Sequence, residues 1–366
     1  MKMGIGWPVI TLRKRQFLRG FLKMENSRRN RNRYNRNEDT VSPAAENDRS
    51  DQESLQQYIN AASSQNTKRT YSSALRQFEK WGGRLPTDRD TIVHYLLDKA
   101  RQLNPRSLEL HMTAISQWHK AQGMVDPVQD MLVRQTIHGI RRTHGKPPKK
   151  AKALRLEHIA TMLDHLESLP HGPKKIRDRA LLLTGFFGAF RRSEIAAIQI
   201  DHLVWEPEGL IILLPKSKTD QDGAGIVRAI PYGSSHCCAA SSIKSWIDEA
   251  GIETGPLFRP INRWGQIKAK KITPAAINEL LKTIGVACGF DFAPELSSHS
   301  FRRGLSTSAA RENIDFALIK KQGGWKSDAT VWGYIDEGQR LMENASIPLM
   351  QKVSDLLSTH KHFENK

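Results

Sequence analysis

The sequence has few cysteines and no long apolar run. Its three cysteines, Cys237, Cys238 and Cys288, include no C-x-x-C pair, which excludes a disulfide framework and a zinc knuckle and suits a reducing compartment. No run approaches the ~20 apolar residues that a membrane span needs. The apolar run at 4–12 precedes its basic residues, whereas a signal peptide has the opposite order. We therefore expect a cytoplasmic protein.

Acidic residues are also scarce relative to basic ones. Lys and Arg number 56 against 38 Asp and Glu, so the formal net charge is +18. A surface this basic binds polyanions by displacing counterions from phosphates, which favours a nucleic acid as the partner. A basic soluble protein without such a partner is the alternative. Apolar residues make up 39% of the chain, enough for a buried core, and the length predicts two domains.

Composition and periodicity divide the chain into five segments. Residues 1–50 predict a disordered basic and polar arm, in which Met24 is a plausible alternative start. Residues 51–145 predict a helical domain, and the Pro- and Lys-rich stretch 146–153 predicts a linker. Residues 154–350 predict a mixed domain, followed by a helix or tail at 351–366. Basic residues spread along the helical domain are its candidate DNA contacts: Lys68, Arg69, Arg76, Arg106, Lys120, Arg134, Arg141 and Arg142.

The second domain predicts mainly helices with one small sheet. Strands are expected at 209–215 and 225–232, joined by a polar turn. Helices are expected at 155–169, 176–190, 238–250, 273–288, 300–312 and 315–322, and an amphipathic one at 347–358.

Four short motifs in this domain carry side chains suited to phosphoryl transfer. They are R-R-S-E at 191–194, K-S-K-T at 216–219, H-S-F-R at 299–302 and G-G-W at 323–325, which Tyr334 follows nine residues after the Trp. Two arginines and a lysine at one spot would bind a phosphodiester, because a guanidinium matches two non-bridging oxygens. Tyrosine has an ordinary pKa of about 10, so attack on phosphorus would need this cationic pocket and a nearby base. Fixed cations would stabilise the pentacoordinate state without a metal, and no acidic cluster shows metal-ligand spacing.

In order and spacing, these motifs resemble those of the tyrosine site-specific recombinases, the phage integrase family. The resemblance covers about residues 52–350. It implies a mainly α fold with a small β-sheet, in which a helical core-binding domain and a mixed α/β catalytic domain form a C-shaped clamp on DNA. Many members carry His where Trp325 stands, and the Trp should keep the hydrogen-bonding role.

The resemblance also implies a role for each motif residue. Tyr334 would form a 3′-phosphotyrosyl bond and release a 5′-hydroxyl. Arg191 and Arg302 would clamp the scissile phosphate. The remaining roles are general acid for Lys218, proton transfer for His299, phosphate support for Trp325, and orientation of His299 or Arg191 for Glu194.

Partners and cofactors follow from the same resemblance. The partner would be double-stranded DNA with inverted-repeat half-sites, bound by a homotetramer in which strand exchange passes through a Holliday junction. No cofactor, metal or ATP would be needed, because the phosphotyrosine link conserves bond energy. The expected location is the bacterial nucleoid.

Each assignment has a simpler alternative. Arg192 competes with Arg191 and Lys216 with Lys218, and Trp325 could simply be core. His299 and Arg302 could be an ordinary helix-terminal pair. The other tyrosines are Tyr34, Tyr58, Tyr71, Tyr95 and Tyr232, but only Tyr334 follows the H-x-x-R segment. The terminal helix could pack on its own domain, although we favour docking into a neighbouring subunit.

Two other functions compete with recombination. One is an inactive integrase-like protein that only binds DNA or regulates. The other is a type IB topoisomerase or a telomere resolvase, which would share the tyrosine chemistry. The presence of every motif residue argues against the first, and the two-domain layout argues against the second.

Overall fold

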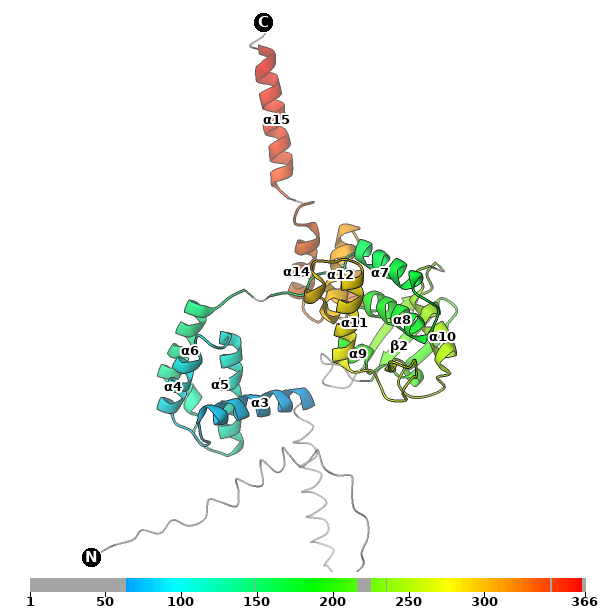
Figure 1. Ribbon diagram of the computed structural model, residues 1–366. Coiled ribbons are helices and arrows are strands. Elements are labelled where there is room, and N and C mark those ends of the chain that lie inside the picture. Colours follow the sequence, from blue (N-terminus) through cyan, green and yellow to red (C-terminus); the bar gives the residue numbers. More distant parts are fainter. Residues whose placement is uncertain (1–63, 148, 216–224, 235, 343, 364–366) are drawn as a thin grey trace, which may run out of the picture. The chain divides into compact units, whose positions relative to one another are not determined.

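The chain divides into two compact units, Met1–Pro148 and Lys149–Lys366, each described by itself. The structure is a computed structural model that describes residues 64–147, 149–215, 225–234, 236–342 and 344–363, with side chains up to 357 (Figure 1). The arm predicted at 1–50 lies outside the described residues, and so does the stretch 51–63 of the predicted helical domain. The division between the units falls within the predicted linker segment.

The described part of the first unit is helical, as predicted. Its elements are α3 (Gln65–Trp81), α4 (Arg89–Lys99), α5 (Pro105–Ala121), η1 (Pro127–Gln129) and α6 (Met131–His144). A side-chain oxygen accepts a hydrogen bond from a backbone N–H at the start of each α-helix, because Ser, Asp and Asn satisfy the free N–H groups there. Helix α6 begins at Met131, since Asp130 caps it and the residues just before it form the separate turn η1.

The core of the first unit contains a polar pair. Tyr95 packs edge-on against Phe78, with ring centroids 5.1 Å apart, and both side chains are buried. The Oη of Tyr95 lies 2.6 Å from Nδ1 of the buried His111. Burial raises the pKa of Tyr95 to about 12 and lowers the pKa of His111, so both groups stay neutral at pH 7. Each of the two polar atoms therefore has a partner inside the core.

The second unit is helical with one small sheet, which confirms the predicted fold class. Its helices are α7 (Leu156–Ser168), α8 (Pro173–Phe187), α9 (Arg192–Ile195), η2 (Ile200–His202), α10 (Ala239–Ala250), α11 (Pro274–Ala287), η3 (Ala293–Glu295), α12 (Ser298–Arg311), α13 (Phe316–Gly323), α14 (Asp328–Gln339) and α15 (Ser346–Phe363). Its strands are β1 (Leu203–Glu206), β2 (Gly209–Leu214) and β3 (Ile226–Pro231). No helix among the described residues is long and apolar enough to cross a membrane.

The sheet is antiparallel, in the order β1-β2-β3. In β2 the side chains of Leu210, Ile212 and Leu214 are buried, while Leu213 faces outward and is exposed. The same alternation on β3 buries Arg228, which pairs with Ile212 in the ladder. One arginine therefore occupies an inward position of the sheet.

Helix α8 is the central element of this unit. Its residues 180–186 are all buried, and α10 and α12 pack against it. The indole of Trp246 on α10 is buried and donates a hydrogen bond to the carbonyl oxygen of Leu257 at 2.8 Å. This core fixes the C-terminal end of α8, from which the first motif follows.

Five elements differ from the sequence prediction. Helix α8 ends at Phe187 rather than Phe190, because Gly188 and Ala189 turn the chain and Ala189 has a φ of 47°. Strand β1, α9 and α14 were not predicted. The terminal helix α15 begins at Ser346 and therefore runs through residue 350, where the second domain was predicted to end.

Candidate active site

The turn after α8 presents the first motif. Arg191 is the N-cap residue of the short helix α9, and the carboxylate of Glu194 accepts from both its backbone N–H, at 2.8 Å, and its Nη1, at 2.6 Å. Glu194 is buried, and Arg191 is half-buried. Arg192, by contrast, is exposed. The local fold therefore singles out Arg191 as the arginine that a buried carboxylate orients.

Helix α12 carries the H-x-x-R motif. Its N-cap is Ser297, whose hydroxyl accepts from the backbone N–H of His299 at 3.3 Å. Arg302, one turn later, is only 2% exposed and its Nη1 donates to the carbonyl oxygen of Ala189. That carbonyl belongs to the turn just before Arg191, so the bond brings the first and third motifs together. His299 is exposed at the helix start.

The G-G-W motif forms the turn after α13. Gly324 caps α13 in the left-handed conformation, with a φ of 59°, and Trp325 follows. The indole of Trp325 is 7% exposed, and Cζ of Arg302 lies 4.5 Å from the centroid of its ring. Trp325 is thus both a core residue and a platform under a guanidinium group, which is a cation–π arrangement.

Tyr334 lies on α14, with its ring centroid 5.5 Å from that of Trp325, and is half-buried. Helix α14 contacts α12 through a small apolar cluster that includes Ala310, Val331 and Ile335, and through several polar contacts. Arg303 pairs with Glu337, Arg311 donates to the carbonyl oxygen of Gly338 at 3.2 Å, and Gln339 donates to that of Ala310 at 3.1 Å. These contacts hold the tyrosine-bearing helix beside the helix that carries Arg302.

Three guanidinium groups and one carboxylate act on one another electrostatically here. Burial, together with the nearby positive charge of Arg191, lowers the pKa of Arg302 to about 10, against the opposing effect of Glu194. Burial also lowers the pKa of Arg228, which likewise senses Glu194 and Arg191. Three guanidinium groups and one carboxylate give the cluster a formal net charge of about +2.

A negative charge would suit this cluster. Within the described residues, Nη2 of Arg302 and Nε of Arg228 are buried and have no hydrogen-bond partner. Leaving a buried donor unpaired is costly, and a charged one more so. An anion with several acceptor oxygens, such as a phosphodiester, would supply the missing acceptor to Arg302.

The structure therefore gathers most of the predicted catalytic set. Arg191, Glu194, Arg302, Trp325 and Tyr334 lie together, with His299 one helical turn before Arg302. Lys218 and its rival Lys216 lie in 216–224, outside the described residues. Among the described residues, no group of three or more His, Cys, Asp or Glu side chains could hold a metal ion.

Motif analysis did not include Arg228, although the sequence holds a signal for it. It stands between Ile226 and Ile230 on a predicted strand, and the alternation of a strand places all three on one face. An arginine on the inward face of a strand is unusual because burying an unpaired charge is costly.

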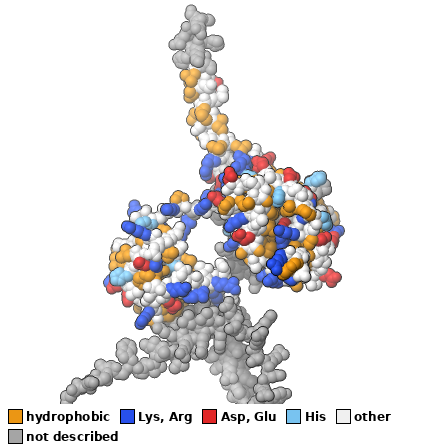
Figure 2. All heavy atoms as spheres, viewed as in Figure 1, with side chains coloured by type: hydrophobic (Ala, Val, Ile, Leu, Met, Phe, Trp, Pro, Cys, Tyr) orange, Lys and Arg blue, Asp and Glu red, His pale blue; other side chains and the backbone are white. Residues whose placement is uncertain are grey.

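The predicted DNA contacts of the first unit lie on α3, α5 and α6. All are exposed except Lys68, which is half-buried. Figure 2 shows Lys and Arg side chains gathered along α3. Two of the basic residues form ion pairs, Lys120 with Asp126 and Arg141 with Glu109, each at 3.5 Å.

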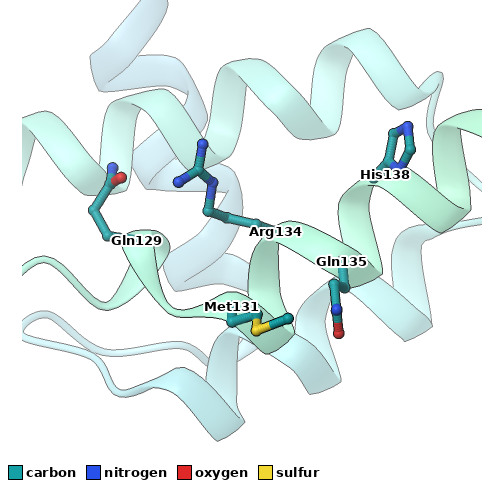
Figure 3. Close-up of a pocket in the computed structure, with 5 residues that line it drawn as sticks. All are labelled: Gln129, Met131, Arg134, Gln135 and His138. Carbon is teal, nitrogen blue, oxygen red and sulfur yellow. The ribbon is translucent and has the colours of Figure 1, made fainter.

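A hollow of about 460 Å³ lies on η1 and α6, away from the catalytic motifs in sequence. It is lined by Gln129, Met131, Arg134, Gln135 and His138. Figure 3 shows Arg134 and His138 projecting from one side of α6 and Gln135 from another. It contains none of the predicted catalytic residues, and only Arg134 of the predicted DNA contacts lines it.

Comparison with known proteins shows the family of this chain. The profile of the phage integrase family matches residues 152–340. An integrase/recombinase XerD homolog of Selenomonas ruminantium is 34% identical over 289 residues, 76% of this chain and 84% of that protein. Recombinase Cre of Escherichia phage P1 is 25% identical over 280 residues, 70% of this chain and 77% of Cre.

A solved structure shares the fold. The XerH site-specific recombinase, in a post-cleavage complex with palindromic difH substrate, superposes with a TM-score of 0.57 at 19% identity, covering 76% of this chain and 79% of XerH. The family profile spans the α8 turn, the sheet, α12, the G-G-W turn and Tyr334, the same segments that build the arginine cluster. The chain belongs to the phage integrase family and is a tyrosine recombinase.

Proposed function

We propose that this tyrosine recombinase cleaves and rejoins DNA at specific sites, with Tyr334 as the nucleophile. The observation that carries the assignment is that Trp325 lies between Tyr334 and the buried Arg302. Nη2 of Arg302 has no acceptor among the described residues. The XerD homolog and Cre, named as recombinases, support the same reaction for this chain.

The proposed reaction begins with binding of the scissile phosphate. Arg191 and Arg302 would each donate to the non-bridging oxygens of this phosphate. Glu194 orients Arg191, and the carbonyl oxygen of Ala189 anchors Arg302. A phosphodiester carries one negative charge, and attack by a tyrosinate adds a second on the pentacoordinate state. The cluster charge of about +2 matches that transition state better than the ground state, which is how a fixed site accelerates a step.

Bond making and proton transfer complete the step. The Tyr334 oxygen would bond to phosphorus as the bond to the 5′-oxygen breaks, leaving a 3′-phosphotyrosyl link and a 5′-hydroxyl. His299 would assist the proton transfers, Trp325 would support the phosphate, and Lys218 would protonate the leaving 5′-oxygen. The link conserves the energy of the phosphodiester, so the reverse attack by a 5′-hydroxyl rejoins DNA without ATP.

The first unit would contribute to DNA binding. Exposed basic residues on α3, α5 and α6 supply the charge that a phosphate backbone needs. A recombinase acting on such DNA would reside at the bacterial nucleoid.

Assembly into a homotetramer on inverted half-sites would allow two sequential strand exchanges through a Holliday junction. Helix α15 supports assembly, because its apolar side chains are exposed: Ile347, Leu349, Met350, Val353, Leu356 and Leu357. Figure 2 shows hydrophobic side chains along this helix. Docking of α15 into a neighbouring subunit would bury this surface.

The proposed function is tested with a nicked suicide DNA substrate that carries a candidate site from the flanking genome. Wild-type protein is expected to form a covalent adduct that survives denaturing electrophoresis, with chelator present. Tyr334→Phe should form none, because it lacks the attacking oxygen, while its affinity for DNA should remain within about twofold.

The matched control is Tyr232→Phe, which removes an exposed hydroxyl from the residue after β3 and should leave adduct formation unchanged. Salt-sensitive binding without an adduct on any flanking site would instead indicate a DNA-binding protein. An adduct retained by Tyr334→Phe would assign the nucleophile to another residue.

A further inference from the structure

Arg228 is a buried arginine that no catalytic motif accounts for. It lies on the inward face of β3 and is only 4% exposed. Its Nη1 donates to the carbonyl oxygen of Val227 at 3.1 Å, and its Nη2 donates to that of Gly323 at 3.0 Å. The second bond joins β3 to the last residue of α13, 95 positions further along the chain.

The two glycines of the G-G-W motif fit the side chains on either side of them. A Cβ on Gly324 would lie 2.2 Å from Nη2 of Arg228, so the guanidinium occupies the space that any other residue would need. A Cβ on Gly323 would lie 1.5 Å from the ring of Trp325. The turn is thus shaped around the guanidinium of Arg228 and the indole of Trp325.

A second side chain ties the same turn down. Nε2 of Gln322 donates to the carbonyl oxygen of Phe187 at 2.6 Å and to that of Ala229 at 3.2 Å. Residues 322 and 323 are therefore hydrogen-bonded to residues on β3 and to the end of α8. Arg302 reaches the same α8 turn through Ala189.

Stability alone does not explain a charge at this position. Within the described residues no carboxylate forms an ion pair with Arg228, and its Nε has no hydrogen-bond partner. Burying a cation on such terms is costly, and replacing buried charges by apolar residues of similar volume is often neutral or stabilising. A methionine would fill the space between Ile226 and Ile230 without that cost.

We propose that Arg228 is a positioning residue of the active site, which fixes the Gly323–Gly324 turn so that the indole of Trp325 lies against Arg302 and Tyr334. The indole is the shared neighbour of these two groups, at 4.5 Å from Cζ of Arg302 and 5.5 Å from the Tyr334 ring. Loss of the Gly323 bond would leave this turn tied to β3 and α8 by Gln322 alone, and the indole would shift. This inference rests on the proposed function for its effect on catalysis, although the placement of Trp325 can be tested separately.

The catalytic test compares Arg228→Met with wild type in single-turnover cleavage of the suicide substrate. Adduct formation is expected to slow by about 10- to 100-fold, since a displacement of about 1 Å can cost that much. DNA affinity should stay within about twofold, because Arg228 is buried. Arg228→Lys keeps one donor toward Gly323 and should recover part of the rate.

A double-mutant cycle identifies the route of the effect. If Arg228 acts through Trp325, the cleavage rate of the double variant Arg228→Met with Trp325→Phe should lie within about twofold of the rate of Trp325→Phe alone. The matched control is Arg179→Met, which removes an arginine whose Nη2 donates to the carbonyl oxygen of His236 at 2.7 Å on another part of the unit. It should leave the cleavage rate unchanged.

A spectroscopic readout is independent of activity. Protein labelled with 5-fluorotryptophan gives a ¹⁹F resonance for Trp325, assigned by its absence in Trp325→Phe. Arg228→Met should shift or broaden that resonance, whereas Arg179→Met should not. An unmoved resonance, or additive effects in the cycle, would overturn the inference. Absence of an adduct in wild type would count against the proposed function, while the resonance would still decide the placement of Trp325.

Discussion

Two pairs of adjacent arginines show how one residue type takes opposite roles. In the pair Arg191 and Arg192, the first is held by the buried Glu194 and the second is exposed. In the pair Arg302 and Arg303, the first lies over Trp325 and the second binds Glu337 on α14. A helix turns each successive residue by about 100°, so neighbours face different surroundings even when both are buried. Placement on the helix, rather than charge, decides which guanidinium can meet a phosphate.

Arg302→Lys should therefore lose most of the catalytic rate. Lysine offers one compact ammonium, which cannot donate to Ala189, lie flat on the indole and bind a phosphate oxygen together. We expect single-turnover adduct formation to slow by about 10²- to 10³-fold, with DNA affinity changed by less than about fivefold. The control Arg192→Lys changes an exposed residue and should stay within about twofold of wild type. A rate near wild type for Arg302→Lys would show that charge alone suffices at this position.

Motif spacing identified Arg191, Arg302, Trp325 and Tyr334 in advance, and these residues do meet. It could not identify Arg228, because this residue belongs to no motif and its importance depends on a contact 95 positions away along the chain. Nor could it show that Glu194 binds Arg191 in this structure, since orientation of either His299 or Arg191 satisfied the same spacing. The roles assigned to these residues remain proposals for the adduct experiments to decide.

Elements with a wide apolar face were predictable, and elements held by polar or small residues were not. Helix α8 was expected because its segment is strongly apolar, and its residues 180–186 are all buried. Helix α14 was missed because it buries only Val331, Ile335 and Gly338, in a small cluster completed by residues of other elements. Strand β1 was missed because it is a four-residue edge strand with no fully buried side chain. Such contacts depend on the partner element, so the short apolar pattern of the segment itself is only a weak signal.

Helix α12 packs closely against the backbone at Leu154. The backbone N–H of Leu154 donates to the carbonyl oxygen of Ser300 at 3.1 Å, so the chain entering the second unit lies directly on α12. A Cβ on Gly304 would lie 1.8 Å from the carbonyl oxygen of Leu154. Backbone cannot move aside as a flexible side chain can.

Gly304→Ala should destabilise the second unit for this reason. We expect a loss of about 2 kcal/mol in the free energy of unfolding, because the strain outweighs the gain in helix propensity. The melting temperature of this unit should fall by about 4–8 °C. The control Gly333→Ala on α14 meets nothing within 4 Å and should be neutral or stabilising by up to about 1 kcal/mol. Thermal unfolding followed by circular dichroism measures both, and equal melting temperatures for the two variants would contradict the packing argument.

At the scale of the whole molecule, the charge was informative in the sequence. The net charge of +18 already favoured a nucleic acid, and family membership agrees with that expectation. The division between the units falls where prolines and lysines replace apolar residues. The partner of α15 was less clear from the sequence, because an amphipathic pattern does not say what covers its apolar side. Leu349, Met350 and Val353 are 55–66% exposed in the single chain, so that side is uncovered there.

If α15 docks into a neighbouring subunit, a charge on its apolar side should separate DNA binding from assembly. Val353→Glu places a carboxylate among Leu349, Met350, Leu356 and Leu357, where docking would have to bury it at a cost of several kcal/mol. Gln351→Glu adds the same charge on the opposite side of the helix and serves as the control. We expect both variants to bind a single half-site like wild type. On a paired site, only Val353→Glu should fail to form the multi-subunit complex seen by light scattering and should fail to recombine two sites. Normal assembly by Val353→Glu would mean that α15 is covered by its own subunit or by another partner, and the tetramer would then have to be held together by other surfaces.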